Sequence, residues 1–483
     1  MKISTRNLFL IILFSGIFYF SLRPITDPDF WWHLRTGQLM EQTRAILRED
    51  PFSWTARGNP WITHEWLSEL FIYQFFKLGS YQLLTIIFSL VITASLLFSF
   101  IRCPPESVPY VAGFSLLLGA LASGPLWGVR PQMITLLFTS IFLYLLDRYK
   151  RDGQLGTLIP IPLLVLLWVN LHAAYILGIV VEITYIFGWL VELAILKFRK
   201  KENIDKTTKN KFLILVAVLV LSLLVMPINP AGLQIFAYPF RTLFDPAMQK
   251  YIQEWFSPDF HNLMWQPLAL MILALIGVGM TGNHLVSMTK ILLTLGFGFA
   301  ALRSARHVPL FVIVVIPVLA EQFSNLIKIN PTTQAPNRLL RWMNTIVISA
   351  IALVMVLTLF QLPGKQQEAV TLNYPEDAVE WIVENQPQGK LFNSYNWGGY
   401  LIWRLYPEYP VYIDGRADLY GGEFLSNYFD VYSTALGWED KLNEENIQIV
   451  IVETDSKLAD ALQQSANWKI SFKDSVGVVF TRE

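Results

Sequence analysis

Apolar runs long enough to cross a lipid bilayer recur along most of this 483-residue chain. A helix needs roughly 20 mostly apolar residues to span the hydrocarbon core. Only 15% of the residues are charged, whereas a soluble domain averages about 25%. Because spanning segments must satisfy their own backbone hydrogen bonds, these long runs predict a polytopic α-helical membrane protein.

We predict about eleven spans, with ends accurate to a few residues. Some are short or broken by Gly and Pro, so any count from about ten to thirteen stays open. No small-x-small cleavage site follows the first run, which we take as an uncleaved span. The predicted spans are roughly 7–22, 82–101, 108–126, 132–147, 157–171, 174–197, 212–227, 265–281, 289–302, 308–323 and 343–361.

Basic residues gather in three of the loops between these spans. They are Arg148, Lys150 and Arg151 after the fourth span, Lys197, Arg199, Lys200, Lys201, Lys206, Lys209 and Lys211 after the sixth, and Lys328, Arg338 and Arg341 after the tenth. Short cytoplasmic loops carry the excess of Lys and Arg, so the N-terminus is expected inside. An odd number of spans then places the C-terminus outside the cytoplasm.

The sequence becomes that of a soluble domain from Lys365 onward. Helical and strand patterns alternate there, which predicts a small α/β domain. The expected strands are roughly 389–393, 410–414, 447–453, 468–473 and 476–481. We therefore expect a transmembrane domain over 1–364, with outer loops 23–81 and 228–264, and an extracytoplasmic α/β domain over 365–483.

The loop after the first span is polar, aromatic and rich in acids. Asp27 and Pro28 predict a helix start with Asp27 at the N-cap, Asp29 in the first turn and His33 one turn later on the same face. One interpretation is that the acids only cap the helix and suit its dipole. The other is that they form a carboxylate pair that binds a divalent cation or acts as a base.

A second helix is expected to begin in the same loop, with Thr63 as its N-cap. This places His64 and Glu65 at its N-terminus, facing whatever the loop encloses. Glu65 can also be explained as an acid that the helix dipole stabilises.

Further polar residues are expected on the outer side of the membrane. Arg303, Arg306 and His307 form a basic cluster at a span end, which suits a phosphate group or contacts lipid headgroups. The other candidates are Arg130, Asn170 and His172. All of them can also be explained as interfacial residues that line no site.

Two further candidate positions with acidic residues lie outside the first loop. Asp414 and Arg416 follow a predicted strand end, where α/β sheets place binding groups, although the pair can also simply fix a turn. Glu182 and Glu192 lie in the sixth span, and acids within a membrane are either functional or paired inside the bundle.

Several classes of site have no support in the sequence. The single cysteine excludes an internal disulfide framework and a cysteine-based zinc site. A net charge of zero gives no electrostatic reason to expect nucleic acid as a partner. No P-loop, serine-hydrolase elbow or zinc-protease helix is present.

The stretch from Asp27-Pro28-Asp29 to Trp66, directly after the first span, resembles the first outer loop of the GT-C glycosyltransferases, in particular bacterial mannosyl- and arabinosyl-transferases. The resemblance covers the layout of 1–361. It implies hexosyl or pentosyl transfer from a polyprenyl-phosphate-linked sugar to a glycan, lipid or protein, outside a bacterial or archaeal inner membrane. Asp29 would be the catalytic carboxylate with Asp27 or His33 beside it, and a divalent metal (Mg²⁺ or Mn²⁺) on Asp27 and Asp29 is left open.

Two other classes of function compete with a transferase. A transporter, flippase or ligase-type protein for a lipid-linked glycan usually shows inverted repeats, and no long repeat is evident. A non-enzymatic envelope assembly protein would be insensitive to single substitutions of the outer-loop carboxylates.

Overall fold

The computed structural model describes residues 4–104, 109–200, 205–243, 245–281, 286–326 and 338–483, so Lys201 and Lys328 lie outside it. The described chain divides into two compact units. The first comprises Met1–Arg23, Ile86–Pro239 and Gln253–Phe360, and the second comprises Pro24–Thr85, Phe240–Ile252 and Gln361–Glu483. Each unit is described separately below.

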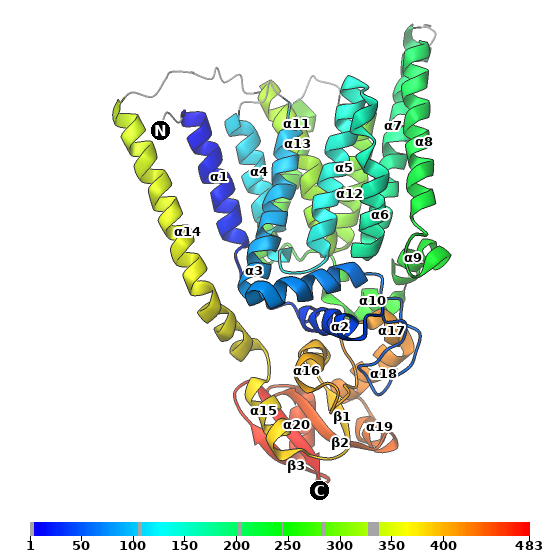
Figure 1. The fold of residues 1–483 in the computed structure, drawn as a ribbon, viewed down its shortest axis with the longest axis vertical. Helices are drawn as coiled ribbons and strands as arrows, with labels where there is room; N and C mark the ends of the chain where they lie inside the picture. The colour runs from blue at the N-terminus through cyan, green and yellow to red at the C-terminus, as the bar shows by residue number, and fades with distance from the viewer. Residues whose placement is uncertain (1–3, 105–108, 201–204, 244, 282–285, 327–337) are drawn as a thin grey trace. The chain divides into compact units, whose positions relative to one another are not determined.

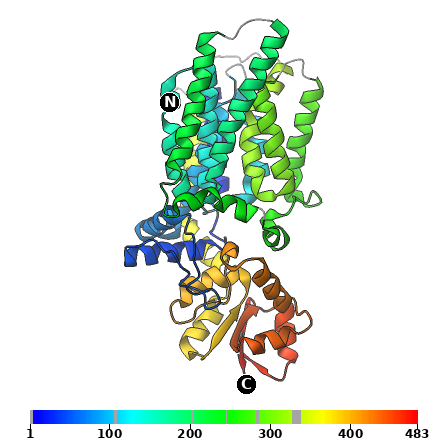
Figure 2. The ribbon, with the colours of Figure 1, turned by 90° about the vertical axis from the view of Figure 1, so that its right-hand side faces the viewer.

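The first unit is a helical bundle whose long helices stand side by side (Figures 1 and 2). Its helices are α1 Thr5–Ser21, α4 Pro109–Ser123, α5 Gln132–Asp152, α6 Pro160–Leu171, α7 Ile176–Lys200, α8 Lys206–Val225, α11 Gln266–Thr281, α12 Met288–Arg303 and α13 Val308–Leu326, with parts of α3 Trp66–Ile101, α9 Tyr238–Leu243 and α14 Arg338–Asn373. Each predicted span coincides with a helix. Seven helical segments of the described residues are long and apolar enough to cross a membrane. The polytopic α-helical fold is therefore confirmed.

Helix α13 forms the core of this bundle. It is apolar on all sides and almost wholly buried, as a helix with no polar face should be. Helix α4 approaches it closely at Gly119, where a Cβ atom would lie 2.8 Å from Val312. The acids of α7 have partners in the bundle: Glu182 accepts a hydrogen bond from Ser222 (2.8 Å) and Glu192 pairs with Lys150 (2.6 Å).

The second unit joins the first outer loop to the C-terminal α/β segment. Its elements are α2 Phe30–Thr43, the first part of α3, α10 Pro246–Tyr251, α15 Glu376–Asn385, α16 Gly398–Leu405, α17 Ala417–Tyr420, α18 Gly422–Tyr432, α19 Trp438–Glu444, α20 Lys457–Gln464 and strands β1 Lys390–Asn393, β2 Ile447–Glu453, β3 Trp468–Lys473 and β4 Gly477–Arg482. The sheet has the order β1-β2-β4-β3, with β1 and β2 parallel and the other pairs antiparallel. The predicted α/β character of this segment is confirmed.

The strand predicted at 410–414 is wrong. Val411 makes only an isolated bridge, and its backbone pairs with the first outer loop: its N–H donates to Phe52 O (3.1 Å), and Trp54 N–H donates to its carbonyl (3.0 Å). The Asn393 side chain accepts the next N–H, from Tyr412 (2.8 Å). The apolar pattern was that of a strand, but its backbone hydrogen bonds go to a loop and a side chain instead of a sheet neighbour.

Candidate active site

The Asp27–Asp29 turn directly precedes helix α2. Asp27 Oδ1 accepts the backbone N–H of Asp29 (2.9 Å), and α2 begins at Phe30 with Asp29 in the N-cap position. The predicted N-cap is therefore wrong by two residues, because the Asp27 carboxylate closes a turn ahead of the helix. Asp29 is half-buried, and its Oδ1 accepts a hydrogen bond from Trp32 Nε1 (3.0 Å). This bond fixes the carboxylate relative to α2.

Two glycines of the C-terminal segment lie against this turn. A Cβ atom on Gly415 would overlap Asp29 Oδ1, and one on Gly399 would overlap the carbonyl oxygen of Pro28. The Asp29 carboxylate is thus covered by backbone that only glycine allows to come so close. Residues 399 and 415 therefore help to form the surroundings of Asp29, which sequence reasoning did not anticipate.

A buried cluster of histidine and glutamate lies on the first turns of α2 and α3. His33 Nε2 is 3.6 Å from Glu65 Oε2, and His33 Nδ1 is 3.4 Å from Glu69 Oε1. The three residues are at most 7% exposed. The indole of Trp32, which binds Asp29, lies 3.6 Å from the His33 ring between centroids. His33 is therefore held by two glutamates and linked to Asp29 through Trp32.

His64 extends this cluster, with Nε2 at 3.3 Å from Glu65 Oε1. Burial opposes the charged form of His64, but the neighbouring Glu65 outweighs it and raises the pKa of His64 above its usual value. Helix α3 begins at Trp66, two residues later than predicted, because Thr63 donates its hydroxyl to Leu47 O (2.6 Å). Glu69 was missed, although its spacing of four residues from Glu65 places both on one helix face.

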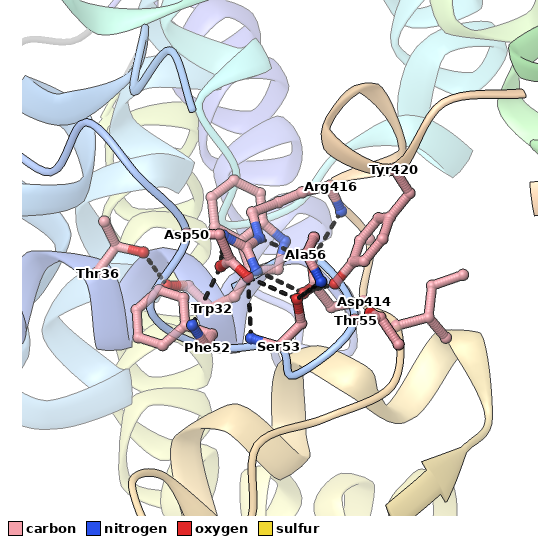
Figure 3. Close-up of polar contacts among 12 residues, drawn as sticks. Trp32, Thr36, Asp50, Phe52, Ser53, Thr55, Ala56, Asp414, Arg416 and Tyr420 are labelled. Carbon is pink, nitrogen blue, oxygen red and sulfur yellow. Dashed lines mark hydrogen bonds and ion pairs between the residues drawn. The ribbon is translucent and has the colours of Figure 1, made fainter. Parts of the chain in front are cut away.

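An ion cluster joins the first outer loop to the C-terminal segment (Figure 3). Arg416 Nη1 lies 2.8 Å from Asp50 Oδ1, while Arg416 Nε and Nη2 donate to Asp414 Oδ1 (2.8 Å) and Oδ2 (2.6 Å). The guanidinium also lies over the Trp61 ring, 4.5 Å from its centroid. All three charged side chains are at most 2% exposed.

The charges in this cluster stabilise one another. Burial alone would raise the pKa of Asp414, but the Arg416 guanidinium outweighs it and lowers that pKa. Tyr420 adds a hydrogen bond to Asp414 Oδ2 (2.7 Å), which Figure 3 also draws. Asp414 and Arg416 thus form a buried ion cluster with Asp50. Sequence reasoning did not name Asp50 as a candidate residue. Their predicted role in binding substrate stays a prediction.

In the first unit, three of the predicted binding residues gather around Glu254 and Trp255. Arg130 forms a two-point ion pair with Glu254, and the Arg306 guanidinium lies 4.6 Å from the Trp255 ring centroid. The His307 ring packs edge-on against Trp255. Burial favours a neutral Glu254, but Arg130, with Arg306 further off, lowers its pKa. Arg303 is exposed and is the last residue of α12, directly before the same turn.

Asn170 and His172 tie the turn between α6 and α7. Asn170 donates to Ile228 O (3.0 Å) and accepts from the Asn229 amide (3.2 Å). His172 Nδ1 is 2.7 Å from the Thr135 hydroxyl. These contacts explain both residues as parts of the scaffold, and their role in lining a site stays a prediction.

The described residues contain no group of three or more His, Cys, Asp or Glu side chains that could hold a metal ion. Metal binding by Asp27 and Asp29 stays a prediction.

Solved structures with a similar fold are membrane transferases. Archaeal oligosaccharyltransferase AglB from Archaeoglobus fulgidus, in complex with an inhibitory peptide and a dolichol-phosphate, is 11% identical, with 92% of this chain and 69% of that chain covered and a TM-score of 0.55. The Archaeoglobus fulgidus oligosaccharyltransferase in complex with Zn and sulfate is 11% identical, with 97% and 73% covered and a TM-score of 0.52.

ArnT from Cupriavidus metallidurans bound to undecaprenyl phosphate is 13% identical, covering 98% of this chain and 97% of that chain with a TM-score of 0.48. No family model and no curated protein sequence matches the chain. The likeness to the oligosaccharyltransferase concerns the fold. The chain shares the fold of these oligosaccharyltransferase structures, which agrees with the fold expected from the resemblance of its first outer loop.

Proposed function

We propose that this chain is a glycosyltransferase that moves a hexose or pentose from a polyprenyl-phosphate donor to an acceptor on the extracytoplasmic face of the membrane. The fold supports this proposal, since the oligosaccharyltransferase that shares it was solved with a dolichol-phosphate. The orientation rests on the three basic loops, which favour a cytoplasmic N-terminus and an extracytoplasmic C-terminus.

The observation that carries the proposal is the placement of Asp29. Its carboxylate is half-buried, bound by the Trp32 indole and covered by Gly415, so its position is defined by packing on two sides. A catalytic group needs this kind of support, because errors of about 0.5 Å already matter for reaction geometry. The buried pair of His33 and Glu65 lies behind Trp32 in the same chain of contacts.

The proposed chemistry assigns the role of general base to Asp29. The acceptor hydroxyl oxygen forms a bond to the anomeric carbon of the donor sugar, and Asp29 takes the hydroxyl proton. The bond between that carbon and the phosphate oxygen breaks, and the lipid phosphate leaves with the electron pair. The His33, Glu65 and Glu69 cluster positions Trp32 and, through it, the Asp29 carboxylate.

A divalent ion is compatible with the residues present. Asp27 and Asp29 offer the oxygen ligands that Mg²⁺ prefers, and Mg²⁺ often uses only one or two carboxylates together with substrate phosphate oxygens. Bound there, the ion would supply positive charge that stabilises the departing phosphate. Treatment with EDTA, followed by addition of Mg²⁺ or Mn²⁺, tests whether transfer depends on it.

The basic residues of the first unit are a separate proposal for binding a lipid phosphate group, and it does not depend on the chemistry assigned to Asp29. Arg306 and His307 pack on Trp255, and Arg130 pairs with Glu254, so several basic side chains gather in this part of the first unit. Arginine suits phosphate because its planar fork can make two hydrogen bonds.

The substitution Asp29→Asn tests the function. It keeps the size of the side chain and an acceptor for Trp32, but removes the base. A general base contributes about 10²–10⁴-fold to the rate, so sugar transfer from a radiolabelled lipid-linked donor pool should fall at least about a hundredfold. Asp460→Asn, which changes an exposed carboxylate on α20 of the same unit, is the control. Near-normal transfer by Asp29→Asn at unchanged protein abundance would return Asp29 to a structural role.

A further inference from the structure

A cavity of about 190 Å³ lies in the second unit, and its wall includes Trp31 and Tyr400, the sequence neighbours of Trp32 and Gly399. It is lined by α2, the kink of α3, the C-terminal part of α14 and helix α16. Since about 10–15 Å³ of such space suffices for one water molecule, the cavity has room for a small ligand. This volume suits a single small ring better than an extended chain.

Aromatic side chains form much of the cavity wall. Trp31, Tyr81, Tyr400 and Trp403 all line it. Trp31 meets Tyr400 edge to face with 5.0 Å between ring centroids, and Trp403 and Tyr81 both pack on Phe76 at 5.7 and 5.0 Å. These contacts hold the rings in fixed orientations. A sugar ring fits such a wall, because its faces carry C–H groups and its edges carry hydroxyls.

The polar groups of the cavity suit a neutral ligand. Arg404 lies 3.7 Å from Glu376 and 3.8 Å from Glu380, and it also donates to the Tyr400 hydroxyl (2.7 Å). Gln367 donates to Glu376 as well (3.0 Å). One guanidinium shared by two carboxylates leaves no excess positive charge for a phosphate. Carboxylate and amide groups line the cavity beside this guanidinium.

One polar atom of the wall has no well-aligned partner. The indole nitrogen of Trp31 is buried and makes no hydrogen bond of good geometry among the described residues, although it interacts with the Tyr374 hydroxyl. A buried N–H without a well-placed acceptor costs free energy, and a ligand oxygen would remove that cost. Trp31 is 1% exposed and lines the cavity.

We propose that this cavity binds one neutral sugar ring of the acceptor, which makes the acceptor a glycan. The inference rests on the proposed function, since it names the acceptor class of that reaction. It adds Trp403 and Glu376 as specificity-determining residues that take no part in the chemistry at Asp29.

Binding is tested on the full chain, purified in a detergent without a sugar headgroup. Methyl α-mannopyranoside and methyl β-glucopyranoside, which cannot act as lipid-linked donors, are titrated while ligand saturation-transfer NMR and tryptophan fluorescence are recorded. Trp403→Ala should weaken binding at least about tenfold, because it removes one aromatic wall. Glu376→Gln, which keeps the shape of the cavity, should shift the preference between the two glycosides. Trp381→Ala, on α15 and outside the cavity wall, should leave binding unchanged.

Three results would overturn the proposal. These are no saturable binding of either glycoside at millimolar concentration, equal weakening by Trp403→Ala and Trp381→Ala, and tighter binding of glycerol phosphate than of the glycosides. Asp29→Asn separates this inference from the proposed function. Normal transfer by that variant contradicts the catalytic role while glycoside binding still stands, and lost transfer without any glycoside binding contradicts only the sugar site.

Discussion

Removal of Arg416 should show how much the ion pairs between the first outer loop and the C-terminal segment stabilise the second unit. Arg416→Met keeps the length of the side chain but leaves Asp50 and Asp414 buried, at 2% and 0% exposure, without their cation. Breaking a buried ion pair by removing one partner costs about 3–5 kcal/mol. For a unit of this size the thermal midpoint should then fall on the order of 10 °C.

The pH dependence of stability should change sign in the same variant. In the wild type Arg416 lowers the pKa of Asp414, so its contribution is present above the unfolded value of about 3.9 and is lost as the pH falls through the folded pKa. In Arg416→Met burial remains and raises the pKa of Asp414. The variant should therefore lose stability as the pH rises above about 3.9.

Thermal unfolding of the detergent-solubilised chain, followed by tryptophan fluorescence between pH 3.5 and 6.5, measures both effects. Arg404→Met is the matched control, because Arg404 is 29% exposed in its side chain and its ion pairs are long. Pairs of that kind contribute about 0–1 kcal/mol. If Arg416→Met unfolds within a few degrees of Arg404→Met, or keeps the pH slope of the wild type, these ion pairs do not stabilise this unit.

Two further predictions follow from named contacts, and a third follows from the basic loops. Gly415→Ala should lower transfer at least about tenfold, because its methyl group overlaps the Asp29 carboxylate, while Gly364→Ala at an open position controls for a general effect on the chain. Arg306→Ala should weaken photo-crosslinking of a polyprenyl phosphate probe about tenfold, and unchanged labelling would place the phosphate elsewhere. Reporter fusions at Glu483 and Lys206 should lie on opposite sides of the membrane, and a common side would mean that the span count is wrong.

Local patterns in the sequence were sufficient for the spans and for the α/β character of the C-terminal segment. A long apolar run predicts a membrane-spanning helix wherever it occurs in the chain, because the bilayer sets the length and polarity of any segment that crosses it. The same kind of reasoning located the turn at Asp27 to Asp29, since its Asp and Pro residues act on the backbone within a few positions. It failed by two residues on the helix start, where Asp27 closes a turn instead of capping α2.

Only the tertiary structure decided what surrounds Asp29. Gly415 lies against its carboxylate and Asp50 pairs with Arg416, and neither contact leaves a periodic or spaced pattern in the sequence. Val411 lies in a sequence pattern typical of a strand, yet its backbone hydrogen bonds go to Phe52 and Trp54 of the outer loop. The physical reason is that the spacing of apolar residues depends on which face of one helix or strand is buried. Contacts between residues distant in sequence depend instead on how the whole unit packs, so the local spacing does not reveal them.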